Sequence, residues 1–336
     1  MADLLSSSFL SIAAAGFFVG VVVGLTGMGG GALMTPALIL LGVGETSAIV
    51  TADLTAAAVY KTGGAVVHAR EGSPNFALAK WLVLGSVPMA LLGPYLVAFF
   101  TDPETIEDVL KICIGFALFL AAATYALRIY LNLRARRRGG VKPVENPAVR
   151  PVATLLVGAL GGLLVGVTSV GSGSVIMIAL LMLYPGLSAL RLVGTDLVQA
   201  VPLVLAAAIS NITLHGLDWS LLTPLIVGSV PGTIIGSKIA PRVRQSYIRR
   251  GIVIVLTMSG VALLDKAEFG PLGGGKDYPL LVAAVGAAML VLVPLVWGLL
   301  RRSEGLPMFG TPTVEELDDP KPGGPGRAEG ARSSHP

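Results

Sequence analysis

Long apolar segments recur along most of this chain and alternate with short polar connections. A hydrocarbon core about 30 Å thick needs about 20 mostly apolar residues per helix. Most of the segments reach or approach that length, which predicts an all-α polytopic membrane protein. The segments are Leu4–Thr26, Ala32–Val43, Ser47–Val67, Phe76–Phe100, Val109–Leu131, Val152–Val170, Ser174–Tyr184, Ser188–Leu214, Trp219–Ile239, Gly251–Leu264 and Tyr278–Leu300.

Two glycine-rich stretches interrupt this pattern. Residues 24–31 read Gly-Leu-Thr-Gly-Met-Gly-Gly-Gly, with Pro36 behind them, and a related stretch at residues 166–173 follows 142 positions later. Glycine inside a helix costs roughly 1 kcal/mol relative to alanine. A helix break within lipid is tolerated only where the freed backbone is buried in protein or lines a cavity. We therefore expect broken or re-entrant helices at both stretches, and a functional site beside them.

The two halves of the chain are copies of each other. At an offset of 143, Asp53-Leu54 matches Asp196-Leu197, and the Gly-Ser-Val-Pro at residues 85–88 matches that at residues 228–231. Glycines and a threonine match at an offset of 142, including Thr26 with Thr168. The predicted organisation is a first transmembrane repeat at 4–131, a basic linker at 132–150, a second repeat at 151–264, an extra helix at 278–300 and a disordered tail at 301–336.

Charge in the connecting loops predicts how the copies are oriented. Lys and Arg favour cytoplasmic loops. In the first copy, the loop before the fifth segment has neither residue, and the linker after it is strongly basic. The bias is reversed in the second copy, as expected for inverted-topology repeats. The pattern predicts an external N-terminus and a cytoplasmic C-terminus, with either eleven full spans or seven spans and two re-entrant hairpins.

Composition narrows the classes further. The 336 residues are 54% hydrophobic and 13% charged, and mean hydropathy is +0.79. Soluble domains are usually about 45–50% apolar and about 25% charged. The net charge of +4 lies mainly in loops, so it indicates membrane orientation and no nucleic-acid partner. The single cysteine, Cys113, gives no disulfide framework and no metal motif, and no cofactor or metal is predicted.

The glycine stretches supply the candidate site for a small anion. A helix should restart near Gly31 and near Ser174, and its first N–H groups would favour an anion. The alternative is that these glycines only permit close helix packing. The predicted substrate-binding residues at the stretches are Thr26, Gly27, Gly29, Gly30, Gly31, Thr168, Ser169, Gly171, Ser172, Gly173 and Ser174.

Charged residues within the segments add three candidates. Lys61 lies well inside the third segment, where a charge costs on the order of 2.5–3.5 kcal/mol. We expect Lys61 to neutralise the substrate, the alternative being that it snorkels to the interface. Asp53 and Asp196 are repeat-matched acids, with either a structural role near a helix start or a role in binding a coupling proton or cation. Asp53 is about 12 Å of helix rise from Lys61, so it should have another partner. Gln199, Asn211 and His215 are weaker polar candidates.

These motifs resemble the sulfite exporter TauE/SafE family, also called the toluenesulfonate uptake permeases. The resemblance covers about residues 9–265 and rests on the Gly-x-Gly-Gly-Gly at 27–31, Pro36, the second stretch and the repeated Gly-Ser-Val-Pro. It implies a secondary transporter of sulfite, sulfonates or related small organic anions in the bacterial cytoplasmic membrane. The second copy departs from the pattern at Ser172, where the first copy has a glycine, and at Ile178, which replaces Pro36.

Three function classes follow from these observations. The first is a small-anion permease working by alternating access, with the repeats gating around a site between the breaks. The second is a membrane scaffold that transports nothing. The third is an intramembrane serine hydrolase using Ser172 or Ser174 with His215, which a position of His215 at the membrane edge disfavours. We expect the permease, without catalytic residues. The residues do not specify the substrate, the direction of transport, the coupling ion or the oligomeric state.

Overall fold

The computed structural model describes residues 7–26, 30–70, 74–137, 147–240, 243, 245–269, 279–303 and 308. All regular structure in these residues is α-helical, which confirms the predicted all-α class. The helices are α1 (Ser7–Thr26), α2 (Gly31–Leu41), α3 (Thr46–Arg70), α4 (Phe76–Phe100), α5 (Ile106–Arg137), α6 (Pro151–Thr168), α7 (Val175–Leu183), α8 (Ala189–His215), α9 (Trp219–Ile239), α10 (Gln245–Lys266) and α11 (Pro279–Ser303).

Seven of these helices are long and apolar enough to cross a membrane: α1, α4, α5, α6, α8, α9 and α11. Helices α3 and α10 are comparably long but more polar. By contrast, α2 has 11 residues and α7 has 9, so each extends only about 14–16 Å. That is about half of the hydrocarbon core. The chain is thus a multi-pass membrane protein, and the count of eleven full spans is wrong.

Both helix breaks lie where the glycine stretches predict them. Helix α1 ends at Thr26 and α2 begins at Gly31, while α6 ends at Thr168 and α7 begins at Val175. The extra C-terminal helix is also present as α11. The inverted orientation of the two repeats in the membrane, and the sides on which the termini lie, remain predictions.

The predicted segments differ from the helices mainly at two basic ends. Helix α5 continues through Arg137, beyond the predicted end at Leu131, and α10 begins at Gln245 instead of Gly251. Arginine is a good helix former, so a helix continues past the residues that lie in lipid. The linker predicted at 132–150 therefore begins as helix. Its residues 138–146, and nearly all of the tail predicted at 301–336, lie outside the described residues.

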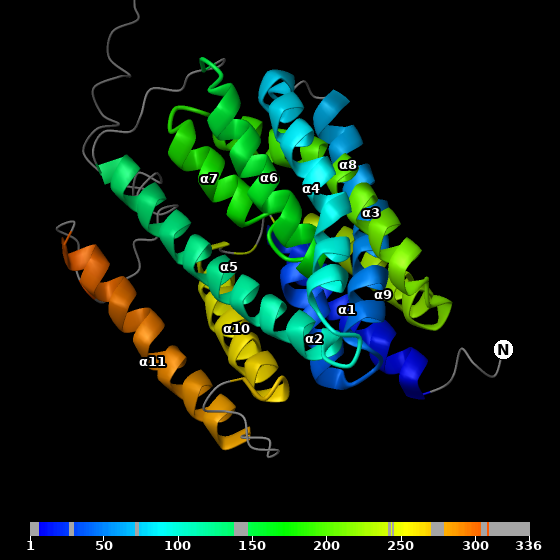
Figure 1. Cartoon of the computed structure of the whole chain (residues 1–336). Helices are drawn as coiled ribbons and strands as arrows, with labels where there is room; N and C mark the ends of the chain where they lie inside the picture. Colours follow the sequence, from blue (N-terminus) through cyan, green and yellow to red (C-terminus); the bar gives the residue numbers. More distant parts are fainter. Residues whose placement is uncertain are drawn as a thin grey trace, which may run out of the picture.

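Helices are exchanged between the two halves: two closely packed pairs each combine one helix of the first half with one helix of the second. Helix α1 of the first half packs along α9 of the second, and α6 of the second packs along α4 of the first. Helix α3 packs on its own counterpart α8, and α5 on its counterpart α10. Helix α11 lies at the edge of the molecule beside α10 (Figure 1). Each half therefore completes the packing of the other.

Glycines spaced four residues apart make the two exchanged interfaces. A Cβ added to Gly20 would lie 2.6 Å from the carbonyl oxygen of Ser229, and one added to Gly162 would lie 2.2 Å from that of Ser86. Side chains do not fit at such distances, so backbones are in direct contact, as in small-residue helix pairs of membranes. Close packing thus explains the glycines that precede each break. These glycines are Gly16, Gly20 and Gly24 in α1 and Gly158, Gly162 and Gly166 in α6.

Candidate functional site

The two helix breaks meet in the buried interior. Gly31, the first residue of α2, lies against Ser169, which directly follows α6. A Cβ on Gly31 would be only 1.9 Å from the carbonyl oxygen of Ser169. The whole segment 168–174 is buried, as is Gly30. Residues from both halves therefore lie together at the breaks, and their role as a substrate site remains a prediction.

Positive backbone dihedrals mark the second break, and a threonine is the last residue of the helix before each break. Ser169 has φ 59° and Gly171 has φ 116°, so the chain turns sharply after α6 in a region that L-residues rarely adopt. The Thr26 hydroxyl donates to the carbonyl of Val22 at 2.7 Å. The Thr168 hydroxyl donates to that of Leu164 at 2.6 Å. These predicted site threonines thus hydrogen-bond within the last turns of α1 and α6.

Lys61 reaches this site from α3. Its side chain is 5% exposed, and its Nζ donates a hydrogen bond to the hydroxyl of Ser172 in the second break. No carboxylate in the described part of the chain lies within 4.0 Å of Nζ. The contact with Ser172 argues against the alternative in which Lys61 snorkels to the interface. A cation is thus buried without a contacting anion.

Asp53 is fully buried and is held by two hydroxyl groups. Its Oδ2 accepts hydrogen bonds from Thr35 at 2.6 Å and from Ser169 at 2.8 Å, while its Oδ1 has no partner among the described residues. Partners other than Lys61 were expected for Asp53. Asp53 is seven residues beyond the first residue of α3, Thr46, and the helix-dipole effect falls off within the first turn. The hydroxyls therefore stabilise this carboxylate, in place of the dipole of its own helix.

Asp196, the repeat-matched acid, has a weaker set of contacts. Its Oδ1 accepts one hydrogen bond from Nε2 of Gln199, at 3.2 Å. The Oε1 of Gln199 is buried, and no described residue hydrogen-bonds to it. Both Asp53 and Asp196 attract the Lys61 ammonium electrostatically. Arg128 of α5 also acts electrostatically on Asp196, so two cations and two carboxylates contribute to this cluster.

The remaining predicted residues complete the surroundings of Lys61. Gly30 donates its backbone N–H to the Tyr60 hydroxyl at 3.1 Å. Ser174 is the N-cap of α7, and its buried hydroxyl has no partner in the part of the chain that the structure describes. Gly173 is buried beside it. Two predicted site residues, Gly27 and Gly29, lie outside the residues that the structure describes.

Two polar contacts of the site were missed in the sequence. Thr35 bonds Asp53, and Tyr60 bonds the backbone of Gly30. Each has a weak local signal, because Thr35 is a polar residue in the otherwise apolar α2 and Tyr60 directly precedes Lys61. Asn211, a weaker candidate, donates to the carbonyl of Gly166 at 2.9 Å. It thereby ties α8 to the end of α6 and has a structural role.

Comparison with known proteins gives consistent matches over this helical region. The family model described as "Sulfite exporter TauE/SafE" matches residues 12–263. The "Probable membrane transporter protein YjnA" of Bacillus subtilis (strain 168) is 37% identical over 257 residues, which is 76% of this chain and 99% of that protein. The "Probable membrane transporter protein YdhB" of the same organism is 26% identical over 249 residues, covering 74% and 97%. No solved structure gives a significant match.

Proposed function

The chain belongs to the sulfite exporter TauE/SafE family, and we propose that it is a secondary transporter that moves a small anion through the site where its two helix breaks meet. One observation carries this proposal. Lys61 is buried at the breaks and bonded to Ser172, and no carboxylate of the described residues contacts it. A buried charge is costly unless it is paired. An anionic substrate would supply the missing partner.

The surroundings of Lys61 suit an oxoanion. Helices α2 and α7 begin at the breaks, and the first N–H groups of a helix favour anions. The buried hydroxyl of Ser174 has no partner and can donate to a substrate oxygen. Sulfite, sulfonates and related small organic anions carry several acceptor oxygens, which matches an ammonium, hydroxyls and N–H groups. We therefore propose this class of substrate.

The two aspartates favour coupling to a proton or another cation. An anion entering the ionised cluster would be repelled by two carboxylates. A proton or cation bound at Asp53 or Asp196 would reduce that repulsion. Transporters built from inverted repeats gate by movement of one repeat against the other. Here the exchanged pairs α1 with α9 and α4 with α6 would act as the moving units around the site between them.

Uptake into proteoliposomes tests this proposal. Labelled sulfite and a small panel of sulfonates would be measured for the wild-type protein, Lys61→Met and the control Lys80→Met, whose lysine is exposed on α4. Hydrogen bonds to charged groups contribute about 1.5–3 kcal/mol, so Lys61→Met should lose about tenfold or more of saturable uptake. The control should match the wild type. Equal flux in Lys61→Met would remove Lys61 from the site.

A serine hydrolase is the second candidate, because Ser172 pairs with Lys61 and Ser–Lys pairs occur among serine enzymes. This pair replaces the one with His215 that the sequence suggests. Labelling of Ser172 by a fluorophosphonate probe, lost in Ser172→Ala, would support the hydrolase. Folded protein that binds no anion of the panel and is not labelled would favour the scaffold.

A further inference from the structure

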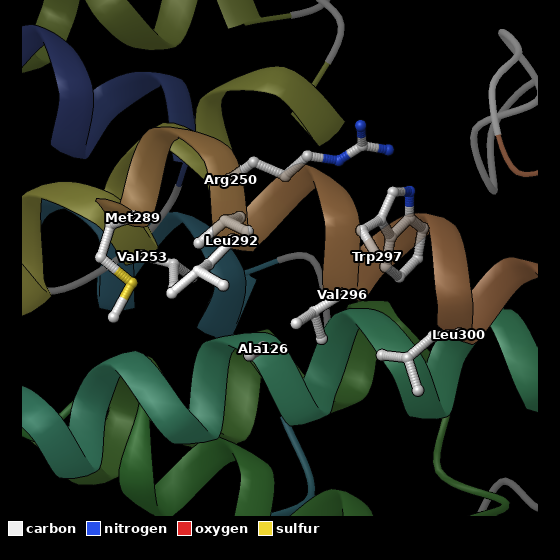
Figure 2. Close-up of a pocket in the computed structure, with 9 residues that line it drawn as sticks. Ala126, Arg250, Val253, Met289, Leu292, Val296, Trp297 and Leu300 are labelled. Atoms are coloured by element: carbon white, nitrogen blue, oxygen red, sulfur yellow. The ribbon is translucent and has the colours of Figure 1, made fainter. Parts of the chain in front are cut away.

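An apolar cavity of about 260 Å³ lies between α5, α10 and α11. Ala126 comes from α5, and Arg250 and Val253 come from α10. The side chains that α11 contributes are Met289, Leu292, Val293, Val296, Trp297 and Leu300 (Figure 2). None of these residues belongs to the proposed transport site. Helix α11 also lies beyond residues 12–263, which the family model matches, so the cavity is an addition to the family core.

One end of the cavity is positively charged. Arg250 is the charged residue among those that line it, and its guanidinium carbon lies 4.9 Å from the ring centroid of Trp297. Arg250 is in the first turns of α10, and Trp297 is in the last turns of α11, which end with Arg301 and Arg302. The basic start of α10 and the basic end of α11 therefore meet at one membrane surface.

We propose that this cavity binds one acyl chain of an anionic phospholipid, with the lipid phosphate at Arg250. Basic pockets between transmembrane helices are suited to anionic headgroups. Tryptophan and arginine are characteristic of the level at which headgroups lie. Loop charge predicts that this surface is cytoplasmic, where anionic lipids create a negative surface potential. The apolar walls exclude a polar ligand, and the arginine selects against lipids without net negative charge.

Lipid binding to the full-length protein in detergent tests this inference. Retained phosphatidylglycerol and phosphatidylcholine would be quantified by native mass spectrometry for the wild type, Arg250→Gln and Val253→Trp. The control is Lys238→Gln, which removes an exposed cation from the end of α9, close to the start of α10. Wild type and control should both prefer phosphatidylglycerol. Losing one arginine near an anionic lipid should weaken that binding about fivefold.

The second variant tests the cavity itself. Val253→Trp should exclude the acyl chain and reduce the retention of phosphatidylglycerol further. If this variant does not yield folded protein, Met289→Phe narrows the same cavity more mildly. A photoreactive residue at Met289 in the full chain should crosslink to lipid.

Three results would overturn the inference. The first is equal retention of the two lipids by the wild type. The second is unchanged retention of phosphatidylglycerol in both Arg250→Gln and the cavity variant. The third is crosslinking from Met289 to another part of the same chain, which would mean that protein fills the cavity.

Discussion

The two halves of this protein are alike in their helix packing and different in their chemistry. Gly20 contacts Ser229, and the repeat-matched Gly162 contacts Ser86 in the same way. The lysine at the breaks is not duplicated, because the position that matches Lys61 is the buried Val204. A single site needs its charge only once, whereas both halves need a closely packed helix pair. Duplication therefore preserves packing and leaves the site free to become asymmetric.

The same asymmetry distinguishes the two aspartates. Thr35, which donates to Asp53, corresponds to the apolar Met177 in the second half. Asp196 instead accepts from Gln199, and the position that matches Gln199 in the first half is Ala56. The matched acids thus have different partners. This difference gives two repeat-matched residues separately testable roles.

The largest expected effect comes from substitutions that disrupt the helix packing shared by the two halves. Gly20→Val and Gly162→Val each force a side chain into a backbone contact, and overpacking costs typically 1–3 kcal/mol and occasionally more. Both variants should lower the midpoint of thermal unfolding in detergent by similar amounts. Gly251→Ala is the control, since a Cβ there meets no atom within 4 Å. A large effect in only one of the two valine variants would show that the interfaces are not equivalent.

The next largest effect tests the difference between the contacts of Asp53 and those of Asp196. Asp53→Ala leaves the hydroxyls of Thr35 and Ser169 without their acceptor, and each buried unsatisfied group costs about 1–3 kcal/mol. Asp196→Ala removes a single hydrogen bond with Gln199. Thermal unfolding should therefore show the larger loss of stability for Asp53→Ala. The opposite order would mean that the hydroxyl contacts contribute little.

The smallest expected effect comes from a substitution that makes the second break resemble the first. Ser172→Gly introduces the residue found at the matching position, Gly30, and removes the acceptor for Lys61. A hydrogen bond to a charged group contributes about 1.5–3 kcal/mol, and the low end of that range applies where the bound anion still pairs with Lys61, so the apparent affinity for the transported anion should fall about tenfold. Ser172→Thr keeps the hydroxyl and should retain most of that affinity. Equal losses in both variants would indicate a steric effect at this position.

Most of the helices could be predicted from the lengths of the apolar segments and from the polar or turn-forming residues that separate them. The segments Phe76–Phe100 and Trp219–Ile239 match α4 and α9 to the residue, because polar or turn-forming residues flank them. The ends of α5 and α10 could not be predicted in this way. Apolarity marks the part of a helix that lies in lipid, and arginine does not end a helix.

The residues of the candidate site could be predicted from the sequence, whereas most of the contacts between them could not. A lysine within an apolar segment and a duplicated aspartate are unusual in any membrane helix, so Lys61, Asp53 and Asp196 stand out. The bonds of Ser169 to Asp53 and of Lys61 to Ser172 join positions more than a hundred residues apart. Such contacts depend on how the two halves pack, which no local pattern specifies.

The exchange of helices between halves also sets an order for assembly on the ribosome. The glycine face of α6 meets α4, which has already been made when α6 emerges. Gly16 of α1 must wait for its neighbour Leu225 in α9, about 210 residues later, which is roughly ten to forty seconds of synthesis. During that time the glycine face of α1 lies in lipid or against another protein. The α4–α6 pair should therefore close first, and the arrival of α9 should be the step that locks the first helix in place.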